Sequence, residues 1–344
     1  MMITVSAMAY VSILKNWTNH VFGGCQSSYR KQTMTNIRKI AKLSGYSVSS
    51  VSRVINNHPH VSEEARQKIL QVMEELDYRP NILAQELSSG STRRVGVVIP
   101  YTTLHPYFSQ LLNGLLDAAL AHNHTLLILP SRYDIDLEKN YLEQLRGRAF
   151  DSLIFTSRSV DIETIASYAK YGNIVCCEEV QELNLSSVYV NRIHACKTAF
   201  NWIKDQGKSK IALLFTRKDL KSSTYRLTME AYNEVFGEKE EPLILDGIST
   251  GEDAYEQGDS LIKHDLDCIF SNGDDVATGV VRYYQEKNLE LPLLIGQEKQ
   301  LTGEVLGIPT IDNKSYQLGQ ESFKQALSDE KRIIILQSEF IIRW

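Results

Sequence analysis

From residue 95 onward, short apolar runs alternate with longer stretches in which apolar residues recur every three or four positions. A short apolar run is typical of a strand buried on both faces, and a longer periodic stretch predicts an amphipathic helix. The expected strands are 95–99, 125–129, 152–156, 174–177, 211–215, 243–245, 268–270 and 293–296. The expected helices between them are 109–122, 136–148, 161–171, 195–206, 225–236, 253–263 and 274–288. Such alternation produces parallel sheets with helices on both faces, so this region is predicted to be α/β and doubly wound.

The strands form two series that meet near residue 190. We therefore expect two similar lobes, completed by a helix at 314–328 and a strand at 333–342. Ligands of such sheets bind beyond the carboxyl ends of the strands, which makes the cleft between the lobes the expected pocket.

Before residue 95 the periodicity is helical. Two short helical patterns flank a turn at Ser44-Gly45-Tyr46, and Ser47 is placed to cap the second helix. The apolar positions that give each helix a buried face are Ile37, Ile40, Ala41 and Leu43 in the first and Val51, Val54 and Ile55 in the second. The positions left facing outward on the second helix are Val48, Ser49, Ser52 and Arg53. This is the helix-turn-helix pattern, whose second helix enters the major groove of DNA.

A third helix is predicted to begin after Ser62 and to end before Pro80. Its stripe closes a small three-helix core and consists of Ala65, Ile69, Val72, Met73 and Leu76. Residues 81–87 then form a helix of one to two turns with Asn81 as its cap, too short to be stable alone. This segment is either an inert linker or a helix that a partner orders.

Charge separates the two regions. Residues 34–94 contain nine lysines and arginines and six acidic residues, whereas residues 95–344 contain 25 basic and 36 acidic residues. The short N-terminal region is basic and the long remainder is acidic. This distribution indicates that only the N-terminal region binds a polyanion.

The composition, 43% hydrophobic and 23% charged, is that of an ordinary globular protein, and no apolar run is long enough for a membrane helix. The five cysteines lack metal-ligand spacing, so we expect reduced thiols, a cytoplasmic protein, and no metal or other cofactor. Residues 1–33 show no complete signal-peptide pattern. We expect them to be a disordered or non-native extension before a natural start at Met34.

The segment from Met34 to Pro100 resembles the N-terminal module of the LacI/GalR family of bacterial repressors. The resemblance rests on the stretches IRKIAKLSGYSVSSVSRVINN, HVSEEARQKILQVMEELDYRPN and ILAQELSSGSTRRVGVVIP. The rest of the chain resembles the family's periplasmic-binding-protein-like sensor through weaker motifs in the same order. The resemblance implies a helix-turn-helix domain at 34–80, a hinge helix and linker at 81–94, and a two-lobed effector-binding and dimerisation domain at 95–344.

The resemblance implies that Val48, Ser49 and Arg53 read the bases of an operator. Arg53 can make a bidentate contact to guanine, and Val48 can contact the methyl group of thymine. Side chains suited to phosphate contacts, which set the register on DNA, are Ser47, Ser50, Ser52, Asn56 and His60.

In this family the hinge helices pair in a dimer and insert a leucine into the minor groove. Leu87 matches that leucine, with Ala84 beside it and Asn81 at the start of the helix. Insertion of an apolar side chain unstacks a base step and kinks the duplex. The resemblance therefore favours a hinge helix over an inert linker, with DNA contact coupled to folding of that helix.

In the sensor, the resemblance places aromatic cleft residues at Tyr107 and Phe108 and a ligand-binding arginine at Arg226. It also aligns Asp274 and Glu298 with two acidic positions of the family's cleft. The alternative is a purely structural role, in which the aromatic residues belong to the core and Arg226 is a surface cation.

This chain departs from the family pattern at three places. Gly273 replaces an asparagine, Glu298 replaces an aspartate, and Asn191-Arg192 replaces the usual Asp-Asn pair. These departures leave the identity of the ligand open.

The sequence favours a dimeric repressor of carbohydrate-related genes that binds a pseudo-palindromic operator and a sugar or sugar phosphate. An alternative is a catabolite-control regulator with a phosphorylated carrier protein as corepressor. A solute-binding protein of a transporter would need an export signal and has no use for a basic N-terminal region. An enzyme is disfavoured because the chain has no Gly-rich phosphate loop, no Gly-x-Ser-x-Gly elbow and no metal-ligand spacing.

Overall fold

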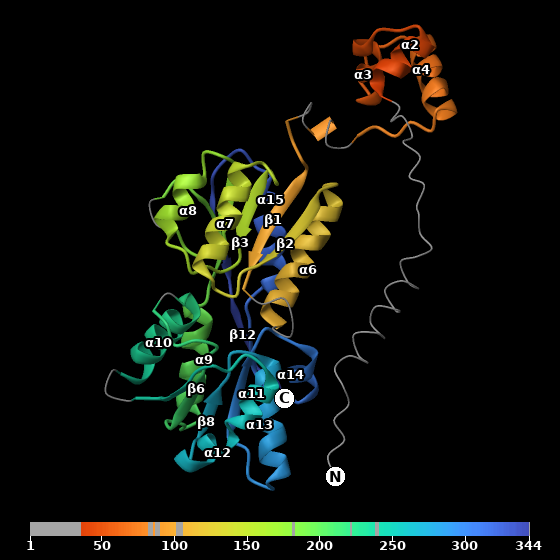
Figure 1. Cartoon of the computed structure of the whole chain (residues 1–344). Coiled ribbons are helices and arrows are strands. Elements are labelled where there is room, and N and C mark those ends of the chain that lie inside the picture. Colours follow the sequence, from red (N-terminus) through yellow and green to blue (C-terminus); the bar gives the residue numbers. More distant parts are fainter. Residues whose placement is uncertain are drawn as a thin grey trace, which may run out of the picture. The chain divides into compact units, whose positions relative to one another are not determined.

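The computed structural model describes residues 36–81, 85–86, 90–100, 106–180, 183–220, 222–237 and 241–343 (Figure 1). The chain divides into two compact units, Met1–Gly90 and Ser91–Trp344. Residues 1–33, the expected extension, lie outside the described residues.

The larger unit consists of two lobes, each built on one six-stranded sheet (Figure 1). The first sheet is parallel throughout and has the order β11-β5-β4-β3-β1-β2. Its strands are β1 (Arg94–Ile99), β2 (Thr125–Pro130), β3 (Ser152–Phe155), β4 (Asn173–Cys176), β5 (Ser186–Asn191) and β11 (Ile333–Gln337).

The second sheet has the order β12-β10-β9-β8-β6-β7, and β12 is antiparallel to β10. Its strands are β6 (Ile211–Leu214), β7 (Leu243–Leu245), β8 (Cys268–Phe270), β9 (Leu293–Gln297), β10 (Thr310–Asp312) and β12 (Glu339–Ile341). The predicted α/β, doubly wound architecture is therefore confirmed.

Helices cover both faces of each sheet because neighbouring strand residues point to opposite faces. In β1, Val97 packs with helices α6 and α15, and Val98 packs with α7 and α8. These helices are α6 (Pro106–Ala121), α7 (Ile135–Arg146), α8 (Ile162–Tyr168) and α15 (Ser315–Ala326). The helices of the second lobe are α9 (Ile193–Asp205), α10 (Ser223–Phe236), α11 (Gly251–Glu256), α12 (Gly258–Leu261), η1 (Ile262–His264), α13 (Asp274–Glu286) and α14 (Leu301–Val305).

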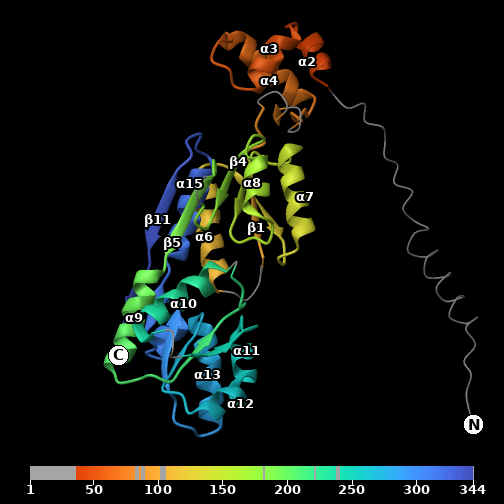
Figure 2. The ribbon, with the colours of Figure 1, turned by 90° about the vertical axis from the view of Figure 1, so that its left-hand side faces the viewer.

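The segment predicted as one strand at 333–342 is in fact two strands in different lobes. β11 pairs with β5 in the first sheet, where Figure 2 shows them side by side, and β12 pairs with β10 in the second. The chain crosses between the lobes at Ser338, whose hydroxyl donates to the carbonyl oxygen of Asn191 at 2.9 Å. The strand character was predicted, but the division into two strands was not, because an apolar pattern does not reveal which sheet a strand joins.

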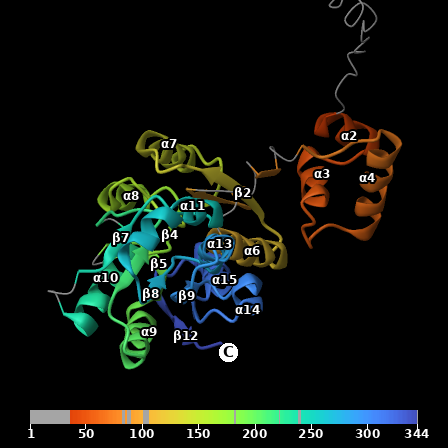
Figure 3. The same ribbon diagram turned by 90° about the horizontal axis from the view of Figure 1, so that it is seen from below.

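The smaller unit contains α2 (Ile37–Ser44), α3 (Val48–Ile55) and α4 (Glu63–Glu75), which Figure 3 shows packed together. Each helix begins at a side-chain cap, because the oxygens of Asn36, Ser47 and Ser62 accept the otherwise unpaired N–H groups near each helix start. Gly45 ends α2 with φ +80°, a conformation that strains other residues.

The core of the smaller unit is the predicted one with a single exception. Its buried apolar side chains are Ile40, Ala41, Val51, Val54, Ala65, Ile69 and Val72. Leu43, which we predicted to join them, is 53% exposed. At about 100° of turn per residue, Leu43 lies roughly 100° away from the centre of the arc formed by Ile40, Ala41 and Ser44. The small Ser44 is buried in its place.

Candidate functional site

Helix α3 presents an exposed polar face with one apolar side chain at its beginning. Val48 is 45% exposed although it is aliphatic, and Ser49 and Arg53 are exposed on the same helix. The opposite face is anchored by Val51 and Val54, so the exposed face is held on a rigid support. An exposed valine and an exposed arginine on one supported helix match what base reading in a groove requires.

Hydroxyl groups gather at the start of this helix. Ser47 Oγ accepts the backbone N–H of Ser50 at 3.1 Å and lies 2.8 Å from the hydroxyl of Ser49 and 3.0 Å from that of Ser50. One turn further on, the amide nitrogen of Asn56 lies 3.5 Å from Ser52 Oγ. Polar groups at a helix N-terminus favour a phosphate, because the helix dipole is positive there.

The remaining predicted DNA contacts lie beyond α3. His60 is exposed, and Asn81 is exposed with its carbonyl oxygen accepting the N–H of Gln85 at 3.1 Å. Ala84 and Leu87 lie outside the described residues.

The larger unit has a pocket lined by side chains that follow the carboxyl ends of strands in both sheets. Its cavity of about 140 Å³ has room for several water molecules and therefore for a small metabolite. The lining includes the predicted Tyr107, Phe108, Arg226 and Glu298. Polar lining residues that the sequence analysis did not select as ligand contacts are Tyr133, Arg158, Glu178, Arg192, Arg217 and Asn272. Except for Arg192, which follows the unpredicted strand β5, these residues come shortly after predicted strands, and that position is the signal that could have found them.

Two arginines of the pocket lie over aromatic rings. The guanidinium of Arg192 is 5.3 Å from the ring centre of Tyr107, and that of Arg217 is 4.2 Å from the ring centre of Tyr133. Tyr133 follows β2 of the first lobe and Arg217 follows β6 of the second, so this contact bridges the lobes. Burial raises the pKa of Tyr107, while the Arg192 charge opposes that rise. The phenol is therefore neutral at pH 7 and able to donate a hydrogen bond.

A third arginine of the pocket is neutralised within the wall. Arg158 Nε donates to Glu178 Oε1 at 2.5 Å, and its Nη1 donates to the carbonyl oxygen of Val160 at 2.8 Å. Both partners of the ion pair are about four-fifths buried, so the pair orders this wall of the cavity.

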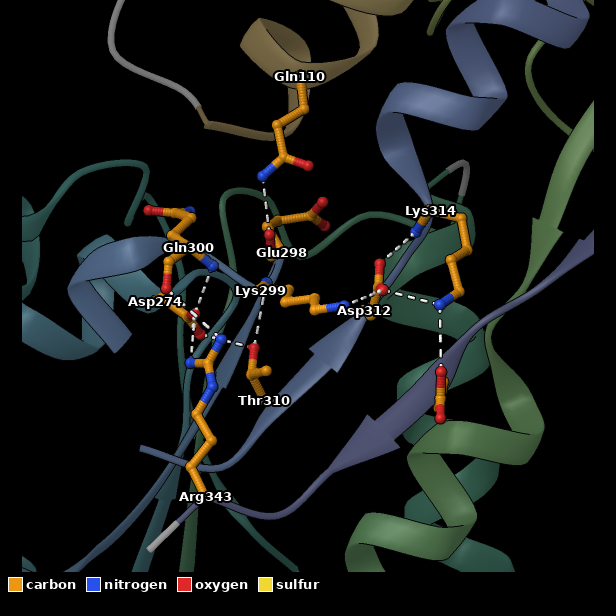
Figure 4. A network of polar contacts seen from close by, with 10 residues as sticks. Gln110, Asp274, Glu298, Lys299, Gln300, Thr310, Asp312, Lys314 and Arg343 are labelled. Atoms are coloured by element: carbon orange, nitrogen blue, oxygen red, sulfur yellow. Dashed lines mark hydrogen bonds and ion pairs between the residues drawn. The ribbon is translucent and has the colours of Figure 1, made fainter. Parts of the chain in front are cut away.

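Glu298 is buried where the lobes meet (Figure 4). Its carboxylate accepts hydrogen bonds from Asn313 at 2.6 Å and Ser315 at 2.5 Å, and its carbonyl oxygen accepts one from Gln110 of α6 at 2.8 Å. Burial raises the pKa of this carboxyl group, against the lowering effect of the Arg192 charge and of these side-chain hydrogen bonds. Glu298 thus ties the lobes together besides lining the cavity.

Asp274, the fifth predicted effector residue, does not line the pocket. Its buried carboxylate receives hydrogen bonds from Arg343 at 3.0 Å, Thr310 at 2.7 Å and the backbone N–H of Gln300 at 2.8 Å (Figure 4). Since the helix α13 begins at Asp274, its side chain points back into the lobe, and the amide of Asn272, two residues earlier, reaches the cavity instead. The predicted effector contact is replaced by a structural ion pair.

The neighbouring Asp275 provides a pH test of this buried region. Burial raises its pKa to about 6, above the ordinary value near 4. A raised pKa means that the contribution of this group to stability is complete below about pH 4 and is lost as the pH rises through 6. Asp275→Asn should therefore stabilise the sensor more at pH 7.5 than at pH 4.5, by about 1–2 kcal/mol after discounting for solvent screening.

Urea unfolding at the two pH values would measure this difference. The exposed Glu304, replaced by Gln, is the matched control and should show little change with pH. An Asp275→Asn effect that is the same at both pH values would contradict the assigned burial.

No helix among the described residues is long and apolar enough to cross a membrane. In the same part of the chain, no group of three or more His, Cys, Asp or Glu side chains could hold a metal ion.

Comparison with known proteins assigns both units. Residues 36–81 match the model for bacterial regulatory proteins of the lacI family, and residues 92–335 match that for periplasmic binding proteins and the sugar binding domain of the LacI family. The chain is 36% identical over 313 residues to catabolite control protein B of Bacillus subtilis (strain 168), a match that covers 89% of this chain and 99% of that protein.

Solved structures show the same fold. The lac repressor dimer bound to operator and the anti-inducer ONPF is similar with a TM-score of 0.76 and 20% identity, covering 90% of this chain and 98% of that one. A LacI family transcriptional regulator from Enterococcus faecium with bound ribose is similar with a TM-score of 0.62 and 19% identity, covering 73% of this chain and 97% of that one.

Proposed function

We propose that this chain, which belongs to the lacI family of bacterial regulatory proteins, represses carbohydrate-related genes by binding an operator through α3 under control of an effector in the inter-lobe pocket. The observation that carries the proposal is the capped helix α3 with its exposed Val48, Ser49 and Arg53. An α-helix supported on one face and polar on the other is what the major groove admits.

In this proposal, Val48, Ser49 and Arg53 read bases, while hydroxyl, amide and imidazole groups contact phosphates. The phosphate contacts are Ser47, Ser50, Ser52, Asn56 and His60. Because phosphate contacts carry no base information, their loss should weaken specific and non-specific DNA binding alike.

Asn81, Ala84 and Leu87 are proposed to form the hinge contact with the minor groove. If Leu87 is inserted between base pairs, only the kinked, specific complex uses it. Leu87→Ala should therefore weaken binding to the operator far more than binding to random DNA, measured by anisotropy at one salt concentration. Equal losses on both DNAs would argue against the hinge role.

We propose that the pocket binds a sugar or sugar phosphate through Tyr107, Phe108, Arg226 and Glu298. Aromatic rings suit the apolar face of a sugar, and a guanidinium can bridge two ligand oxygens. The relative from Enterococcus faecium holds ribose, which supports this ligand class. A ligand that contacts both lobes favours one arrangement of the lobes over another and can thereby change DNA affinity.

A homodimer in the cytoplasm completes the proposal. Two copies of α3 related by a two-fold axis would read the halves of a pseudo-palindromic operator. The similar lac repressor is a dimer on its operator.

The second candidate is a catabolite-control regulator whose corepressor is a phosphorylated carrier protein. This candidate is supported by the name of the relative that is 36% identical, catabolite control protein B. In this case the carrier protein, and not a small molecule alone, would raise operator affinity.

A fluorescence-anisotropy titration of the full chain on a CG-centred palindromic operator tests the proposal, at fixed salt and with random DNA as the control. Binding weakened by a sugar or sugar phosphate would establish an inducible repressor. Binding that only a phosphorylated carrier protein strengthens would favour the second candidate. Equal affinity for operators and random DNA across a library of palindromes would overturn both.

A further inference from the structure

The inter-lobe pocket carries more positive than negative charge. Within the described residues its wall holds four arginines and three glutamates, namely Arg158, Arg192, Arg217, Arg226, Glu178, Glu179 and Glu298. Arg158 and Glu178 neutralise each other, and the carboxylate of Glu298 is engaged by Asn313 and Ser315. The Arg192 charge acts on the buried carboxyl group of Glu298, so Arg217 and Arg226 face the cavity with the exposed Glu179 as their remaining counter-charge in the wall.

Arg217 lies in the segment between β6 and α10, and the exposed Arg226 lies in the first turn of α10. Arg217 has its nearest carboxylate in Asp219 at 3.8 Å, and Asp219 is 44% exposed, so this contact neutralises it weakly. No hydrogen bond or ion pair engages the guanidinium of Arg226 in the part of the chain that the structure describes. Two such cations in one cavity favour the binding of an anion.

The Arg217 side chain is already held in place. Its guanidinium lies over the ring of Tyr133 at 4.2 Å, and its side chain is 24% exposed. Stacking fixes the plane of a guanidinium while leaving the N–H groups at its edge available to a ligand. Less conformational entropy is then lost when the ligand binds.

The first turn of α10 adds backbone donors to the same wall. Ser223 and Thr224 line the pocket, and the first N–H groups of a helix have no partner within the helix. An anion beside this turn would also meet the positive end of the helix dipole.

Asn272 also lines the cavity and carries an unsatisfied polar atom. Its amide nitrogen donates to Thr216 Oγ1 and to the carbonyl oxygen of Ile248, both at 2.8 Å, which fixes the orientation of the amide. Its Oδ1 atom is buried and accepts no hydrogen bond from a described residue. A buried acceptor without a donor is costly.

We infer that the effector, which we place in this pocket on the strength of the proposed function, is a phosphate monoester of a polyol, with its phosphate between Arg217, Arg226 and the first turn of α10. A phosphate offers three acceptor oxygens and nearly two negative charges at pH 7, which matches two guanidinium groups and backbone N–H groups. A neutral sugar would leave these cations uncompensated.

Calorimetric titration of the full chain with matched pairs tests this inference, at constant ionic strength. The pairs are glucose with glucose 6-phosphate, fructose with fructose 1-phosphate, and ribose with ribose 5-phosphate, together with glucuronate, inorganic phosphate and sulfate. At least one ester is expected to bind roughly tenfold to a hundredfold more tightly than its parent sugar, and inorganic phosphate should compete with it.

Arg217→Gln should weaken that ester roughly tenfold to a hundredfold and leave its parent sugar unaffected. Lys218→Gln is the matched control, because Lys218 is the next residue, is exposed and does not line the pocket. An equal loss in both variants would mean that overall charge, not a site, attracts the ester, and would overturn the inference.

Binding of a parent sugar or of glucuronate as tightly as the ester would also overturn the inference, as would no binding by any phosphate compound. Operator titration of the same samples without ligand separates these outcomes from a failure of the proposed function. A chain that prefers its operator but ignores phosphate esters refutes only the ligand assignment.

Discussion

Replacement of Asp274 by alanine is expected to lower the free energy of unfolding of the sensor by about 3–5 kcal/mol. Asp274 is fully buried and its partner Arg343 is 11% exposed, so the variant would leave a nearly buried guanidinium without its counter-charge. The hydroxyl of Thr310 and the backbone N–H of Gln300 would lose the same acceptor. Arg343 lies just after β12, so the attachment of the C-terminal strand should loosen as well.

Urea unfolding followed by intrinsic fluorescence would measure this loss. Glu252→Ala is a suitable control, because it removes the exposed pair with Arg282 at 2.9 Å and should change the free energy of unfolding very little. The folded fraction of Asp274→Ala should retain effector affinity. A stable variant that no longer binds the effector would instead indicate that Asp274 contacts the effector.

Replacement of Arg53 by alanine is expected to cost about 1–3 kcal/mol of operator binding and to relax the preference at one base pair. Arg53 is exposed near the end of α3, on the same helix as the exposed Val48 and Ser49. A bidentate arginine contact to guanine supplies this much discrimination, because an incorrect base lacks the paired acceptors. Binding to random DNA should fall less, since it depends on the total positive charge, of which Arg53 is only one part.

Arg53→Lys is the matched variant, because it retains the charge and removes the planar pair of donors. It should keep most non-specific affinity and lose base preference, as measured with operators substituted at each position. An unchanged preference in both variants would refute the role assigned to Arg53.

The prediction from sequence succeeded where local periodicity determines structure. Strand β1, predicted at 95–99, forms at Arg94–Ile99, and the caps Ser47 and Ser62 begin their helices as expected. The prediction missed β5 and β10, because short strands with polar ends produce no distinct apolar run. Leu43 was misplaced because a stripe drawn from sequence does not show which arc of a short helix meets its neighbours.

The sequence by itself determined the fold class, the helix-turn-helix unit and four of the five selected effector residues as part of one pocket. The fold class and the helix-turn-helix unit depend on spacing along the chain, which sequence records directly, whereas the effector residues were selected through the resemblance to the family. Tertiary structure alone decided that the 333–342 segment joins both lobes, that Asp274 pairs with Arg343, and that Arg217 and Asn272 line the cavity. In each case the decisive contact joins segments far apart in the chain, and its geometry depends on how the two sheets pack.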